Sequence, residues 1–100
     1  MARAFVVEEH HVDDALEHLA KFNGLDHLRG RYRADMLTLE SGPKRDAIAH
    51  ARFRRVGVHR WQLEMPTHSG RWLPTPYRDQ LTNLLDTMIT QFGWTLEPHE

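Results

Sequence analysis

The sequence predicts an α+β fold. We expect a two-layer sandwich, in which an antiparallel β-meander of three to five strands packs against an N-terminal helix and a C-terminal amphipathic helix. Three observations predict it: apolar residues at helical spacing toward both ends, alternating residues in the middle, and turn residues between these segments. One hundred residues is the usual size of one domain, so we expect residues 1–100 to form a single domain.

The first helix is predicted within residues 11–22. Before it, residues 4–8 form a short apolar run that suits either an edge strand or the lead-in to a helix. Apolar side chains then recur at the spacing of one helix face, at Val12, Ala15, Leu16, Leu19 and Phe22. Asn23 and Gly24 predict the end of this helix, because both residues favour the left-handed backbone that follows a last turn.

Three strands are predicted in the middle of the chain, at residues 31–40, 46–56 and 58–65. The second is rich in alanine and suits a helix by propensity, but its alternation at period two favours a strand. Gly57 then predicts a tight hairpin between the last two strands. A turn centred on this glycine places Phe53 opposite Trp61, with the remaining pairs following in register.

A second helix is the clearest local signal toward the C-terminus. Residues 71–73 predict a short strand, which the following proline ends. Thr75 suits the N-cap of a helix and Pro76 its first position. The apolar stripe of this helix comprises Tyr77, Leu81, Leu84, Leu85, Met88 and Phe92. Gly93 predicts its end, and residues 94–96 suit a last short strand.

Composition excludes several classes of protein. The chain has no cysteine, which excludes disulfides, thiol catalysis and thiolate metal sites. No apolar run approaches the roughly 18 residues of a membrane span. The apolar run within residues 1–9 is too short for a signal peptide. We therefore expect a cytoplasmic protein that has no membrane contact and carries no cofactor.

Charge is unevenly distributed along the chain. The net charge is −1, yet residues 29–60 carry nine basic and three acidic side chains, whereas both ends are acidic. Eleven of the thirteen basic residues are arginines, which contact carboxylates and phosphates through two parallel hydrogen bonds. The basic middle of the chain therefore indicates where an anionic partner would bind.

The predicted hairpin gathers charged side chains on the sheet face away from Trp61. With Gly57 at the turn, Arg54 lies opposite Arg60, and His50 lies opposite Glu64. The candidate anion-binding residues are Arg31, Arg33, Arg52, Arg54, Arg60, His50 and Glu64. Such a face suits contact with the phosphates of a nucleic acid. An ordinary solvated sheet face is the alternative.

A sharper hypothesis makes this face a ribonuclease site. His50 and Glu64 would exchange protons while arginines stabilise the negative charge of the transition state. The order of elements and the segment LRGRYR at residues 28–33 resemble the small ribosome-dependent endoribonuclease toxins of bacterial toxin–antitoxin pairs. The resemblance implies RNA cleavage. The chain departs from that family in its net charge, because those toxins are strongly basic.

A metal site is the third hypothesis. His11, Asp14 and His18 fall close together on the helical wheel and could supply three ligands. The alternative is a polar helix flank with an Asp14–His18 pair. The two serines, Ser41 and Ser69, belong to no known nucleophile motif.

The aromatic residues extend the choice of function to protein partners. Most of the set Trp61, Trp72, Tyr77, Phe92 and Trp94 is expected in the core, although one or two could mark a partner surface. Free edge strands would also favour a homodimer. The segment WQLEM at residues 61–65 is similar to a strand of short bacterial proteins, which implies a bacterial source but no activity. The leading interpretation is therefore a non-enzymatic protein-interaction or self-associating module, with nucleic-acid binding or ribonuclease-like action as the alternative.

Overall fold

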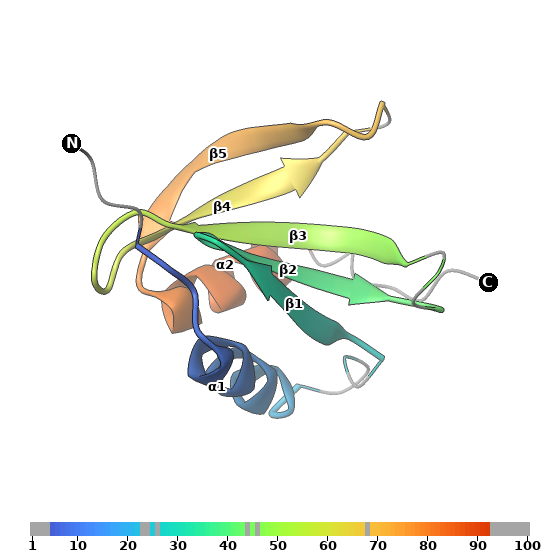
Figure 1. Cartoon of the computed structure of the whole chain (residues 1–100), viewed down its shortest axis with the longest axis horizontal. Helices are drawn as coiled ribbons and strands as arrows, with labels where there is room; N and C mark the ends of the chain where they lie inside the picture. The colour runs from blue at the N-terminus through green and yellow to red at the C-terminus, as the bar shows by residue number, and fades with distance from the viewer. Residues whose placement is uncertain are drawn as a thin grey trace.

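The computed structural model describes residues 5–22, 25, 27–43, 45, 47–67 and 69–92, with only the backbone of the last residue. It confirms the α+β fold, with two helices and a five-stranded antiparallel sheet (Figure 1). The elements in chain order are α1 (Glu9–Leu19), β1 (Arg29–Arg33), β2 (Met36–Ser41), β3 (Ile48–Arg55), β4 (Trp61–Pro66), β5 (Trp72–Asp79) and α2 (Leu81–Phe92).

The sheet is a simple meander in the order β1-β2-β3-β4-β5, and every neighbouring pair is antiparallel. Both helices pack on the same face, α1 against β1 and α2 against β4 and β5, and the helices also touch each other (Figure 1). The core between the two layers is built from Leu37, Leu39, Phe53, Trp61, Leu63, Leu84, Leu85 and Met88, together with smaller side chains of α1. Neither helix of the described part of the chain is long and apolar enough to cross a membrane.

The single strand predicted at residues 31–40 is wrong, because the chain turns at Ala34 and Asp35 to form the β1–β2 hairpin. Ala34 has a left-handed φ of 52°, which is uncommon for a residue with a side chain. Two tertiary hydrogen bonds hold this turn: the Val7 amide donates to the Ala34 carbonyl at 2.8 Å, and the Arg55 amide to the Asp35 carbonyl at 2.8 Å. These partners are distant in sequence, so no local pattern marks the turn.

The β3–β4 hairpin is confirmed, but its predicted register is wrong by two residues. Phe53 pairs with Leu63, and Arg55 rather than Phe53 lies near the turn, opposite Trp61. The turn takes five residues, 56–60, because the Val56 and Gly57 amides both donate to the Arg60 carbonyl, at 2.9 and 3.0 Å. A shift of two residues preserves the face of every side chain but changes every partner.

A bulge interrupts β3 at His50. Leu39 pairs with Ala51, and the next residue of β2, Glu40, pairs with Ala49, so His50 is the extra residue of the bulge. The predicted alternation is therefore broken at this point. The predicted pairing of His50 with Glu64 is wrong, because Glu64 lies opposite Arg52.

The start predicted for the second helix is also wrong. Residues 72–79 continue as β5 through Pro74 and Pro76, which an edge strand tolerates because an edge amide needs no ladder partner. Thr75 caps no helix; its hydroxyl donates to the Leu63 carbonyl at 2.8 Å. Helix α2 begins at Leu81, and its stripe of Leu81, Leu84, Leu85 and Met88 is buried as predicted.

The N-terminal segment and α1 agree with prediction apart from the helix limits. Residues 5–8 form no strand but lead into α1, which begins and ends two to three residues before the predicted limits. Val12, Ala15 and Leu19 are buried. The predicted helix stop at residues 23–24, the stop at Gly93 and the strand at 94–96 lie outside the described residues.

Candidate nucleic-acid interface on the open sheet face

The face of the sheet away from the two helices, called here the outer face, has no helix over it in the described part of the chain (Figure 1). Its charged residues are Arg29, Arg31, Arg33, Arg52, Arg54 and Arg78, with the carboxylates Asp35, Glu40 and Glu64. Six arginines against three carboxylates give this face a net charge of +3. Whether it attracts anions depends on how the carboxylates are engaged.

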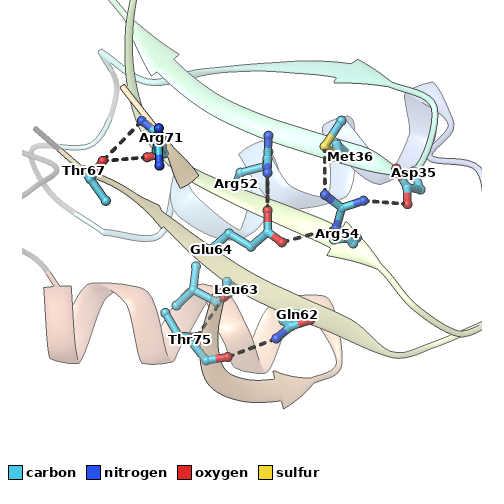
Figure 2. A network of polar contacts seen from close by, with 10 residues as sticks. All are labelled: Asp35, Met36, Arg52, Arg54, Gln62, Leu63, Glu64, Thr67, Arg71 and Thr75. Carbon is cyan, nitrogen blue, oxygen red and sulfur yellow. Dashed lines mark hydrogen bonds and ion pairs between the residues drawn. The ribbon is translucent and has the colours of Figure 1, made fainter. Parts of the chain in front are cut away.

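Glu64 is the centre of one ion-pair cluster (Figure 2). Arg52 Nε donates to its Oε1 at 2.7 Å, and Arg54 Nε donates to its Oε2 at 3.2 Å. The Glu64 side chain is only 8% exposed, although no helix covers it. Arg54 also reaches Asp35 Oδ2 through Nη1 at 3.1 Å, so two carboxylates hold it.

Glu40 is the centre of a second cluster, which joins β2 to β1. Arg29 Nε lies 3.3 Å from Glu40 Oε1, and Arg31 Nε lies 3.3 Å from Glu40 Oε2. Arg29 also donates through Nη1 to the Gly42 carbonyl. The Arg31 side chain is 63% exposed, so one of its edges faces solvent while the other contacts Glu40.

These pairs keep the arginines charged and fixed. Burial acts to lower the pKa of Arg54, but the hydrogen bond and charge of Glu64, with a smaller contribution from Asp35, raise it overall. Glu40 and Glu64 are each shared between two guanidinium groups, so neither neutralises its partners fully. The outer face therefore presents oriented cations with an excess of positive charge.

The aromatic ring of Trp72 lies beside these cations. The Arg52 guanidinium carbon lies 4.6 Å from the centroid of the Trp72 ring, a cation–π contact. Trp72 pairs with Pro66, so the ring rises from β5 on the outer face. A hollow of about 200 Å³ lies beside it, lined by Arg31, Tyr32, Arg33, Met36, Thr38, Arg52 and Trp72.

One lining residue besides Trp72 is well placed to meet a ligand: Arg33 is exposed and has no hydrogen-bonding or ionic partner among the described residues. Tyr32, which pairs with the core residue Leu37, belongs to the opposite face of β1. A planar ring can stack on an aromatic side chain, and an arginine beside it can bind a phosphate. The hollow thus combines the two contacts by which single-stranded nucleic acids are held without sequence readout.

The structure does not bring all the predicted residues to this site. Arg31, Arg33, Arg52, Arg54 and Glu64 share the outer face, as expected. His50 is buried at the bulge, where its Nε2 lies 2.6 Å from Ser41 Oγ and its ring 6.1 Å from that of His27. Arg60 lies in the β3–β4 turn, where it lines a separate hollow with Asp79.

Two of the three predicted metal ligands, His11 and His18, have separate partners. His11 Nδ1 accepts a hydrogen bond from the Glu8 amide at 2.9 Å, and its ring packs edge-on against Trp61. His18 Nε2 lies 2.7 Å from Asp86 Oδ1, which links α1 to α2. Within the residues that the structure describes, no three histidine or acidic side chains are grouped to hold a metal ion.

Trp72 is the site residue that sequence reasoning missed, because most tryptophans were expected in the core. A usable signal was present. A turn centred on Ser69 pairs Trp72 with Pro66, two residues beyond Glu64 on the same face. That pairing puts Trp72 on the arginine face rather than in the core. By contrast, Trp61 is buried in the core as expected.

Comparisons with known proteins add no identity to this geometry. No family model, no curated protein and no solved structure matches the chain. The resemblance to endoribonuclease toxins therefore gains no support from them, and the function has to be argued from the site itself.

Proposed function

We propose that this protein is a non-enzymatic binding module that holds single-stranded nucleic acid on its outer face. The observation that carries the proposal is the outer-face hollow, which is lined by the Trp72 ring together with Arg31 and Arg33 of β1. A base would stack on Trp72 while the arginines contact the neighbouring phosphates. The cytoplasmic setting expected from the sequence belongs to the same proposal.

The charge pairs support binding without hydrolysis. A general base must reach the proton that it removes. Glu64 already accepts hydrogen bonds from Arg52 and Arg54, and His50 is bonded to Ser41 away from Glu64. The acid–base pair of the ribonuclease hypothesis is therefore not assembled, and we assign the arginines to phosphate contact alone.

Fluorescence anisotropy with a labelled single-stranded RNA of mixed sequence tests the proposal. We expect binding that weakens with salt, because phosphate contacts release counterions. Trp72→Ala should weaken binding by about tenfold, within the ~1–3 kcal/mol expected for one stacked base. Lys21→Ala removes an exposed charge just after α1 and serves as the matched control. Absence of binding at low salt, or an equal loss with Lys21→Ala, would overturn the proposal.

Self-association is a second candidate function, which a different surface favours. Val6 and Val58 are 53% and 59% exposed, and Arg55 holds their two carbonyls together through hydrogen bonds of 2.8 Å each. Two exposed valines whose backbones are held by the same arginine suit a partner surface. Light scattering over a range of concentrations should then give a rising mass that Val6→Ser combined with Val58→Ser abolishes. A constant monomer mass would exclude self-association.

The sheet edges themselves do not favour a dimer formed by strand pairing. Edge strand β5 contains Pro74 and Pro76, which have no amide to donate. Edge strand β1 carries Arg29, Arg31 and Arg33, and a second copy would bring like charges together. Self-association would therefore use the surface around Val6 and Val58 rather than pairing of edge strands.

A further inference from the structure

A second cationic hollow lies at the end of β5. It has a volume of about 390 Å³ and is lined by His59, Arg60, Arg78, Asp79 and Gln80. Its lining thus includes two arginines, one histidine and a single carboxylate. The outer-face hollow beside Trp72 shares none of these residues.

The single carboxylate of this hollow is already engaged. Asp79 Oδ1 accepts hydrogen bonds from the Gln80 amide at 2.7 Å and from Asn83 Nδ2 at 3.1 Å, at the start of α2. Arg78 is exposed and has no hydrogen-bonding or ionic partner among the described residues. The hollow therefore keeps one guanidinium available for an external anion.

Arg78 is also aligned with the outer face. Successive pairs across the sheet join Arg33 to Met36, Met36 to Arg54, Arg54 to Gln62 and Gln62 to Arg78. At ~4.8 Å between strands, this row spans about 19 Å from Arg33 to Arg78. Its three arginines cross the sheet at right angles to the strands and end at the second hollow.

We infer that the hollow at Arg60 and Arg78 is a second phosphate site, which takes the far end of the strand bound beside Trp72. The inference rests on the proposed function and names its ligand more closely. The ligand is an oligonucleotide of about four or more residues, at the lower end of single-strand site sizes. It crosses the β-strands along the row from Arg33 to Arg78, with a base in the hollow that Arg33 and Trp72 line and a phosphate at Arg78.

Length-dependent binding tests this inference. Anisotropy is measured with labelled RNAs of about two and about eight nucleotides, which lie below and within the usual site size. Arg78→Ala should weaken the longer RNA about tenfold and lower its salt slope by about one, but leave the shorter RNA unchanged. Arg45→Ala, which removes an exposed charge in the β2–β3 connection, is the matched control.

The outcomes separate the two proposals. If both RNAs bind and Trp72→Ala weakens both, while Arg78→Ala has no effect on the longer one, the second phosphate site is excluded and the proposed function stands. An equal loss for both lengths with Arg78→Ala also excludes it. If neither RNA binds at low salt, the proposed function itself fails. Thermal melting of each variant checks that the exposed substitutions leave the fold intact.

Discussion

The two faces of one sheet are stabilised by different interactions. On the covered face, Phe53 and Leu63 are fully buried beneath the helices. On the outer face, Thr38 and Glu40 are each only 7% exposed although no helix covers them. Thr38 lies between Arg31 and Arg52 across the sheet, so the apolar stems of arginines take the place of a covering layer.

This contrast separates what stabilises the fold from what remains available to a ligand. Apolar burial on the covered face does not depend on charged groups. The arginines of the ion-pair clusters on the outer face are partly exposed, so these pairs contribute less to stability and the guanidinium groups remain open to an external phosphate. Substitutions on the two faces should therefore differ in size and in kind.

The largest expected effect is on the covered face. Phe53→Ala should lower the free energy of unfolding by about 3–5 kcal/mol, because it leaves a cavity beneath both helices. Urea denaturation measures it. Thr38→Ala, on the neighbouring strand but the outer face, should cost about 1 kcal/mol or less. Equal losses of unfolding free energy in the two variants would mean that the two faces contribute equally to stability.

Glu64→Gln tests whether the Glu64 carboxylate stabilises the fold while it lowers the positive charge of the outer face. The variant leaves Arg52 and Arg54 without their shared carboxylate, so we expect a loss of about 2 kcal/mol in urea denaturation. Because the face gains one positive charge, RNA affinity should rise. Glu17→Gln, exposed on α1, should change neither quantity. A stable variant that also binds RNA more weakly would contradict both parts.

Gly30→Ala tests how tightly α1 is packed on the covered face. A Cβ on Gly30 would lie 2.5 Å from Val12 Cγ1, closer than packed atoms approach. We expect a loss of about 1–3 kcal/mol by denaturation, since either the helix or the strand must shift. Adding Val12→Ala should recover part of this loss. Purely additive losses in the double variant would show that the two residues do not compete for space.

The smallest expected effect is a pH dependence at the start of α1. Burial lowers the pKa of His11 below 6.5 in the folded protein, helped by the charges of His10 and Arg55 and opposed by Glu8 and Asp14. Between that lowered value and 6.5, the unfolded chain binds more protons. The free energy of unfolding should therefore decrease as pH falls through this window.

The substitution His11→Gln isolates this contribution. Glutamine keeps an acceptor for the Glu8 amide but does not titrate. Denaturation at about pH 7 and about pH 5 should show a smaller loss of stability in the variant than in the wild-type protein. An identical pH dependence in both proteins would exclude His11 as the source.

Part of the candidate site was predictable from the sequence. Alternation along β3 and β4 correctly separated Phe53, Trp61 and Leu63 from Arg52, Arg54 and Glu64, because side chains of a strand change face at every residue. The charge of residues 29–60 likewise indicated an arginine-rich surface. The partners on that surface were not predictable. A register shift of two residues keeps every face and replaces every pair, so Glu64 meets Arg52 instead of His50.

The sequence by itself determined the fold class, the two apolar helix stripes and the faces of the central strands, because these depend on periodicity within one segment. Only the tertiary structure decided the turn at Ala34, the bulge at His50, the late start of α2 and the position of Trp72 over Arg52. Each depends on a hydrogen bond or contact with a residue that is distant in sequence. Such contacts become available only when the sheet is assembled.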